Sequence, residues 1–251
     1  MSQQPARRIV IGDVHGHYEG MMNLLNTIAP GAEDQVYFLG DLIDRGSQSC
    51  QVLEFVKNSP YQSLLGNHEH LLLEAFPNGQ VHAPAFQAWM QSGGRATISS
   101  YVDIELLVEH VQWIRTLPIY LDLGDVWLVH AGVKPGLAIE QQGYAEFCWI
   151  RDEFHRSTQP YFPDKTIITG HTITFTFQGI TPGAIARGQG WLDIDTGAYH
   201  PKSGWLTALE VDSQQVYQVN VYTNQVRSLA LDEVTMQVKP QKRGRRQALR
   251  L

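Results

Sequence analysis

The stretch RRIVIGDVHGHYEG, residues 7–20, changes from apolar to polar within two residues. Its apolar part, residues 9–11, is short and β-branched, as in a buried strand. Asp13 and His15 follow directly, although a carboxylate and an imidazole are costly to bury without partners. The stretch therefore predicts a strand whose carboxyl end carries polar groups that act together with others from elsewhere in the chain.

Five further apolar segments end in the same way, usually across a glycine. The polar residues that follow them are Asp41, Asp44 and Arg45 in GDLIDRG, Asn67, His68 and Glu69 in GNHE, His130 in HAG, His171 in GHT, and Asp195 in DTG. In open α/β sheets the loops beyond the carboxyl ends of the strands share one edge, where binding sites are built. We expect these side chains to lie close together.

The order of the segments indicates the fold class. Apolar runs at 35–40 and 61–66 read as strands, and they alternate with helical stripes such as the one over 103–117. The second half is rich in strands and includes a hairpin that turns at Gly124-Asp125. Strand-helix alternation followed by antiparallel strands predicts an α/β sandwich with mixed sheets.

Domain boundaries follow from composition. We expect a flexible N-terminus over 1–6, one catalytic domain over 7–230 and a basic, disordered tail over 231–251. Residues 239–251 hold six Lys/Arg and no acid, whereas the rest of the chain holds 13 basic and 25 acidic residues. The acidic body argues against a broad surface for binding nucleic acid.

With no long apolar run and no signal-peptide pattern, we expect a cytoplasmic protein that does not bind membranes.

The side chains at the strand ends form a metal-binding set of mixed oxygen and nitrogen donors. The set comprises Asp13, His15, Asp41, Asn67, His130 and His171. Such donors suit Mn²⁺ or iron better than a structural zinc site, which would use cysteines. Six ligands are too many for one ion with open positions, so they predict two ions that share a carboxylate. Arg45 and Arg151 are suited to bidentate binding of a phosphate.

The motif series GDVHG…GDLIDRG…GNHE…HAG…GHT closely resembles the signature of the phosphoprotein phosphatase family within the calcineurin-like metallophosphoesterases, in its bacterial and phage branch. The resemblance spans residues 9–210 and implies two mixed β-sheets flanked by helices. It also implies that Asp13 and His15 bind a first metal, that Asp41 bridges both metals, and that Asn67, His130 and His171 complete the second. His68 would be the general acid with Asp44 as its partner, and Arg45 and Arg151 would hold the phosphate. The ions would be two divalent metals, Mn²⁺ first, with iron and zinc as alternatives.

The function implied by the resemblance is hydrolysis of phosphomonoesters. A hydroxide between the two metals would attack phosphorus in line, and His68 would protonate the leaving oxygen. The expected substrate is a protein phosphorylated on serine or threonine, or a small phosphoester. The alternative is a symmetrical dinucleoside polyphosphate hydrolase, which shares the metal motifs but typically has Ala where this chain has Asp44. A third hypothesis, a nucleic-acid-binding protein with a vestigial site, is disfavoured by the acidic body and the complete ligand set.

Overall fold

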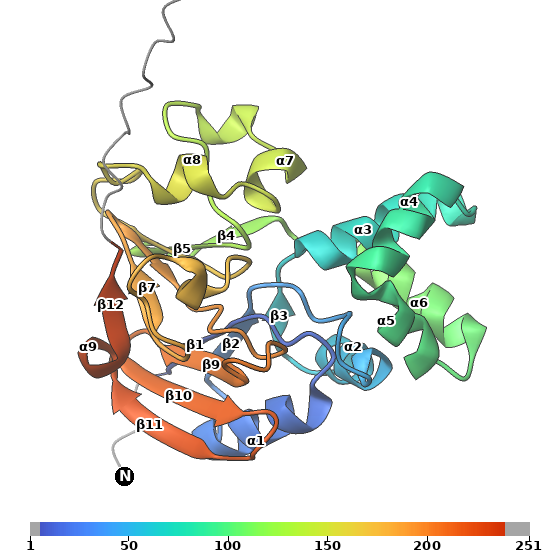
Figure 1. Ribbon diagram of the computed structural model, residues 1–251, viewed down its shortest axis with the longest axis horizontal. Helices are drawn as coiled ribbons and strands as arrows, with labels where there is room; N and C mark the ends of the chain where they lie inside the picture. The colour runs from blue at the N-terminus through green and yellow to red at the C-terminus, as the bar shows by residue number, and fades with distance from the viewer. Residues whose placement is uncertain (1–5, 239–251) are drawn as a thin grey trace, which may run out of the picture.

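The computed structural model describes residues 6–238, and its centre is a pair of mixed β-sheets that pack face to face (Figure 1). The first six-stranded sheet has the order β11 (Val226–Ala230), β10 (Gln215–Asn220), β9 (Trp205–Glu210), β1 (Arg8–Ile11), β2 (Gln35–Phe38), β3 (Gln62–Ser63). The second has the order β12 (Thr235–Gln237), β7 (Ile185–Arg187), β8 (Trp191–Asp193), β6 (Thr166–Thr169), β5 (Val126–Val129), β4 (Tyr120–Asp122). The predicted α/β sandwich with two mixed sheets is confirmed.

The apolar sides of the two sheets form the central core. Side chains such as Val10 and Leu209 from the first sheet pack against Leu128 and Ile168 from the second. All are buried, because alternate residues of a strand point to the same face. The predicted hairpin is also present: β4 pairs antiparallel with β5, and Gly124 at its turn has a φ of 94°.

Helices cover the outer faces of both sheets. The helices are α1 (Tyr18–Ile28), α2 (Ser49–Asn58), α3 (Asn67–Ala75), α4 (Ala83–Trp89), α5 (Arg95–Ser100), α6 (Ile104–Ile114), α7 (Tyr144–Phe147), α8 (Asp152–His155) and α9 (Leu231–Val234), with shorter helical turns at Pro77–Gly79, Met90–Gly94, Ile139–Gln141 and Thr174–Thr176. The stripe of Met21, Leu24, Leu25 and Ile28 on α1 is buried against the first sheet. Side chains of α7 and α8 pack on the second sheet.

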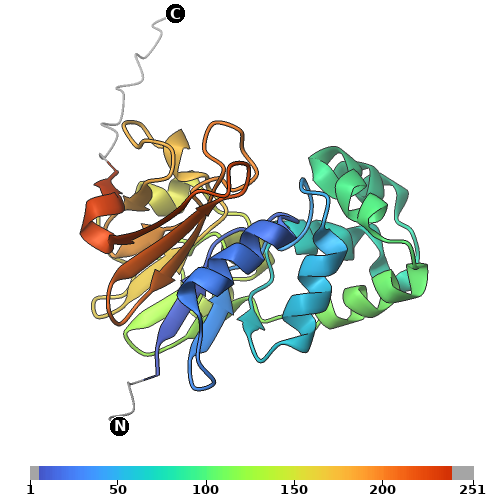
Figure 2. The same cartoon turned by 90° about the horizontal axis from the view of Figure 1, so that it is seen from below.

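Helices α4, α5 and α6 form a helical lobe, residues 83–114, beside the sandwich (Figures 1 and 2). The lobe joins the sandwich through α2 and α3, against which its helices pack. The helix predicted over 103–117 is α6, which is shorter because it ends at Ile114, four residues before Pro118. Asp103 caps its first turn by accepting a hydrogen bond from the Glu105 amide.

The second sheet continues beyond the boundary expected at residue 230. Residues 231–234 form α9, and β12 then pairs in parallel with β7 at the edge of the sheet. Residues 1–5 and 239–251, which include the basic cluster, lie outside the described residues. Within 6–238 no helix combines the length and the apolar character needed to cross a bilayer.

One buried carboxylate joins the loops that follow β2 and β3. Glu69 Oε2 accepts hydrogen bonds from the amides of Gly66 (3.0 Å) and Asp41 (2.8 Å), and Oε1 accepts from those of Leu42 (2.8 Å) and Ile43 (3.2 Å). Burial and the nearby Asp41 charge raise the pKa of Glu69 to about 8, and the amide donors oppose that shift by favouring the carboxylate. The loop that carries Asp41 is therefore fixed by a side chain 28 residues later in the chain.

Replacing this carboxylate by an amide should destabilise the fold. In Glu69→Gln only one oxygen remains to accept, and the new NH₂ group faces backbone donors, so we expect a loss of about 2–3 kcal/mol in the free energy of unfolding by urea. Glu146→Gln is the matched control, because Glu146 accepts from a single helix-start amide, that of Gly143. It should cost less than about 1 kcal/mol. Equal losses in the two variants would contradict the proposed role of Glu69.

The ion pair between Arg7 and Asp34 should make stability depend on pH in the acid range. Arg7, just before β1, binds Asp34 in the loop before β2 through Nη2 at 2.6 Å, and this hydrogen bond lowers the pKa of Asp34 from 3.8 to about 2. Stabilisation by Asp34 is therefore complete above pH 4 and is lost as the pH falls toward 2.

Urea unfolding at several pH values tests this expectation. Asp34→Asn should remove roughly 1–2 kcal/mol at pH 7 and flatten the fall in stability between pH 4 and 2. Asp232→Asn, which removes an exposed ion pair with Arg187, should leave the wild-type profile unchanged. An unaltered profile in Asp34→Asn would show that other groups cause the acid sensitivity.

Candidate active site

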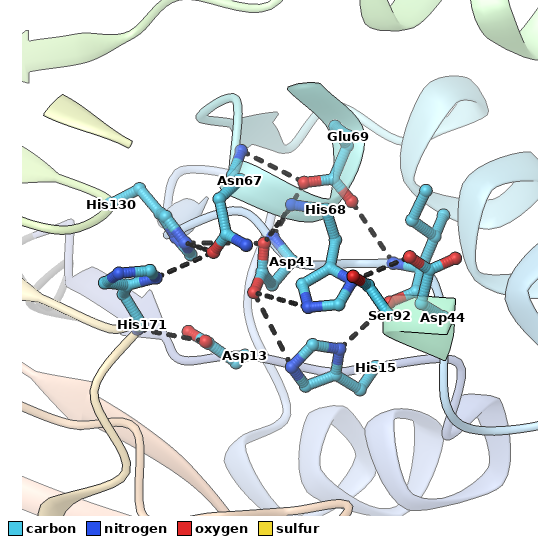
Figure 3. A network of polar contacts seen from close by, with 12 residues as sticks. Asp13, His15, Asp41, Asp44, Asn67, His68, Glu69, Ser92, His130 and His171 are labelled. Carbon is cyan, nitrogen blue, oxygen red and sulfur yellow. Dashed lines mark hydrogen bonds and ion pairs between the residues drawn. The ribbon is translucent and has the colours of Figure 1, made fainter. Parts of the chain in front are cut away.

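The Asp41 side chain lies at the centre of a cluster of polar groups from both sheets (Figure 3). Its carboxylate oxygens are 3.6 Å from His15 Nε2, 3.3 Å from His130 Nε2 and 3.9 Å from His68 Nε2. These residues follow β1, β2, β3 and β5, so the predicted convergence of strand ends is present in the structure. All four side chains are buried.

Two histidines of this cluster, His15 and His130, present lone pairs to Asp41. His15 Nδ1 is 3.0 Å from the carbonyl oxygen of Ile43, and His130 Nδ1 is 2.8 Å from that of Leu39. Because a carbonyl oxygen can only accept, each Nδ1 carries the proton. Burial lowers the pKa of His15 to about 3 and also lowers that of His130, so both rings are neutral. Each Nε2 therefore directs a lone pair at the carboxylate.

The arrangement of lone pairs fits a bound cation. His130 Nε2 faces both Asp41 Oδ1 and Asn67 Oδ1, which is 2.9 Å away. Three acceptors that face one another without a proton repel, and a cation between them removes the repulsion. Two groups of potential ligands share Asp41: one is His15, Asp41 and His68, and the other is Asp41, His130 and His171, with donor atoms within 4.8 Å in each.

Asp13 and His171 reach the cluster from the ends of β1 and β6. The His171 amide donates to Asp13 Oδ2 at 3.0 Å, and Asn67 Oδ1 is 2.7 Å from His171 Nδ1. Asp13 Oδ1 and His171 Nε2 are buried without a hydrogen-bond partner among the described residues. Buried polar atoms without partners are uncommon, and here both belong to predicted metal ligands. Asp13 belongs to neither group of potential ligands, although His68 does.

His68 forms a short hydrogen bond with Asp44, with 2.6 Å between Nδ1 and Oδ2. Burial opposes protonation of the imidazole, but the carboxylates of Asp41 and Asp44 raise the pKa of His68 above its ordinary value. Asp44 is fully buried and also accepts from Trp89 Nε1 at 3.0 Å and Thr97 Oγ1 at 2.5 Å. These donors fix the carboxylate that orients His68.

The structure adds three residues that hold the site in place and that the sequence did not assign a role: Glu69, Trp89 and Thr97. Glu69 belongs to a recognised motif but had no assigned role, although a Glu three residues after Gly66 has the spacing of a helix cap. Trp89 and Thr97 come from the helical lobe, and nothing in their spacing relates them to Asp44. Only the packing of α4 and α5 against the loop after β2 reveals them.

A cavity of about 210 Å³ opens over the cluster. Arg45 and Arg151 both line it, as do Asp195, Trp149 and Tyr199. The Arg45 guanidinium lies 4.4 Å from the centre of the Tyr199 ring. Arg151 Nη1 donates to the His171 carbonyl at 3.2 Å and to Thr172 Oγ1 at 3.0 Å. Two guanidinium groups thus lie beside the potential metal ligands, where they could bind the oxygens of a phosphate.

The backbone of the site is strained. Five of its non-glycine residues have a positive φ: His15 (48°), Asp41 (49°), Asp44 (72°), Arg45 (71°) and His171 (70°). This region costs side-chain-bearing residues roughly 1–3 kcal/mol each and is enriched at functional sites. The glycines of the motifs accommodate such turns: a Cβ on Gly66 would lie 2.3 Å from the Asp41 amide nitrogen.

Comparisons with known proteins identify relatives of this chain. Two bacterial proteins named symmetrical bis(5′-nucleosyl)-tetraphosphatase are similar to part of the chain. The one from Methylococcus capsulatus is 36% identical over 130 residues, 50% of this chain and 42% of that protein. The one from Actinobacillus succinogenes is 33% identical over 131 residues, 50% of this chain and 44% of that protein. The matched segment thus spans less than half the length of either relative.

Solved structures show the same fold over most of the chain. A protein provisionally named a diadenosine tetraphosphatase superposes with a TM-score of 0.62 at 18% identity, over 91% of this chain and 95% of that one. A cold-active protein tyrosine phosphatase superposes with a TM-score of 0.56 at 16% identity, over 92% and 80%. The model of the calcineurin-like phosphoesterase family matches residues 6–208. The chain therefore belongs to the calcineurin-like phosphoesterase family.

Proposed function

We propose that the chain is a metal-dependent hydrolase that cleaves dinucleoside tetraphosphates symmetrically. The observation that carries the proposal is the convergence of potential metal ligands, two arginines and the His68–Asp44 pair on one cavity. The names of the similar bacterial proteins support this substrate over the phosphoprotein expected first from the motifs.

Six residues would hold two divalent cations in this proposal: Asp13, His15, Asp41, Asn67, His130 and His171. Their donor set contains oxygen and imidazole nitrogen but no thiolate, which suits Mn²⁺ and also accommodates iron or zinc. Bound divalent cations would neutralise phosphate charge and make a nearby water more acidic.

The other side chains act on the substrate directly. Arg45 and Arg151 would bind the non-bridging oxygens of the phosphate under attack and stabilise the charge that grows there. His68 would donate the proton on Nε2 to the leaving oxygen, while Asp44 holds Nδ1–H and stabilises the imidazolium. In a dinucleoside tetraphosphate the leaving group is a nucleoside diphosphate, whose oxygen departs more readily than an alkoxide.

A phosphomonoester substrate remains the second candidate because of Asp44. A serine or ribose alkoxide leaves poorly unless it is protonated, and the buried Asp44 is well placed to keep His68 protonated for that purpose. The two candidates therefore differ in how strongly turnover should depend on His68.

A substrate panel separates the candidates. Purified protein with Mn²⁺ should hydrolyse diadenosine tetraphosphate with a kcat/KM at least about tenfold above that for a phosphoserine peptide, and ADP should be the only nucleotide product. Removal of divalent metal by a chelator should abolish both activities, and added Mn²⁺ should restore them. A higher kcat/KM for the phosphopeptide would favour the second candidate, and activity that survives chelation would contradict both.

His68→Asn tests the general acid. Turnover of an alkyl phosphate should fall roughly 10²- to 10⁴-fold. Turnover of p-nitrophenyl phosphate should fall much less, because p-nitrophenolate leaves without a proton. Metal content measured by mass spectrometry should match the wild type. Equal losses on both substrates would exclude proton donation by His68, and loss of metal would assign His68 to the metal ligands instead.

A further inference from the structure

An aromatic cluster of three residues, Trp149, His70 and Tyr144, lies at one side of the catalytic cavity. Tyr144 stacks on His70 with ring centres 4.7 Å apart and an angle of 29°. Trp149 Nε1 donates to His70 Nδ1 at 3.4 Å, with the rings nearly perpendicular. Tyr144 is on α7 and His70 on α3, so this stack brings together two residues that are 74 positions apart in the chain.

Trp149 joins this cluster to the cavity. Its indole lines the cavity together with Asn67, His68 and Arg151, and its ring centre is 6.5 Å from that of His171. Yet 37% of Trp149 and 50% of Tyr144 are exposed. Large aromatic side chains with this much exposure beside a phosphate-binding cavity are typical of ligand contacts.

The polar atoms of the cluster suit a nucleobase better than a plain phenyl ring. Because His70 Nδ1 accepts from Trp149, its proton is on Nε2, which is then a donor. Tyr144 carries a hydroxyl with no hydrogen-bond partner within residues 6–238. A purine offers ring nitrogens that accept from such donors as well as a flat face that stacks on indole. A phenyl group offers the face alone.

We propose that Trp149 is the stacking platform for one nucleobase of the substrate, with His70 and Tyr144 at the edge of the base. This inference deepens the proposed function and rests on it for the identity of the natural substrate. The base binds in the ground state and the transition state alike, so the contact lowers KM and leaves kcat unchanged.

Binding of two monoesters that differ only in the base tests the platform directly. Titration calorimetry on the full chain with Mn²⁺ should show AMP binding more tightly than ribose 5-phosphate. Trp149→Ala should weaken AMP binding roughly 5- to 100-fold and leave ribose 5-phosphate unaffected. Trp149→Phe should retain most of the AMP affinity, because a phenyl ring still stacks.

Tyr120→Ala is the control for general damage to the protein. Tyr120 is equally exposed, at 38%, but lies on β4, away from the cavity. It should leave both affinities unchanged. Kinetics with diadenosine tetraphosphate supply a second readout: in Trp149→Ala, KM should rise by a similar factor at constant kcat.

These experiments test the stacking role of Trp149 separately from the proposed function. Equal affinity of the wild type for AMP and ribose 5-phosphate would overturn the platform, even if diadenosine tetraphosphate is hydrolysed. A loss of affinity for both ligands in Trp149→Ala would assign Trp149 a structural role and overturn it as well. A selective loss of AMP affinity without turnover of diadenosine tetraphosphate would support the platform and contradict the proposed function.

Discussion

The capture of four backbone amides by the Glu69 carboxylate is the constraint on which the site depends. The loop after β2 turns through residues with positive φ, where intrahelical or sheet hydrogen bonds are unavailable. The inward-facing Glu69 carboxylate accepts hydrogen bonds from the Asp41, Leu42 and Ile43 amides of this loop. These hydrogen bonds satisfy buried donors and also orient the loop. Asp41 thereby reaches the midpoint between side chains from both sheets. The fold brings the strand ends together, and the hydrogen bonds of Glu69 fix the loops that follow β2 and β3 relative to each other.

Electrostatic frustration is concentrated around Asp41. Neutral histidines direct lone pairs at its carboxylate, and Asp13 and His171 carry buried atoms without partners among the described residues. Strained backbone conformations occur at the same positions. Each of these features costs stability, and bound cations would relieve the electrostatic part. The apolar core between the sheets supplies the stability that sustains these loops.

The sequence revealed those parts of the site that follow strands. Asp13, Asp41 and His130 each come within three residues of a strand end, and parallel pairing brings such ends together. Trp89 and Thr97 could not be found in this way, because they act through the packing of helices with no periodic relation to Asp44. The phosphoprotein substrate inferred from Asp44 is less well supported, since that residue reports on leaving-group protonation rather than on the shape of the cleft.

The helical lobe contributes hydrogen-bond donors to the site at the edge of the sandwich. Two of the donors that satisfy Asp44, Trp89 and Thr97, belong to it, and the Gly93 carbonyl of the lobe also accepts from the Arg45 amide. A shortened protein that kept both sheets but lacked residues 83–114 would lose these donors to Asp44 and the side chains that cover it. A change in the packing of this lobe would therefore alter the hydrogen bonds that hold Asp44, and through Asp44 the orientation of His68.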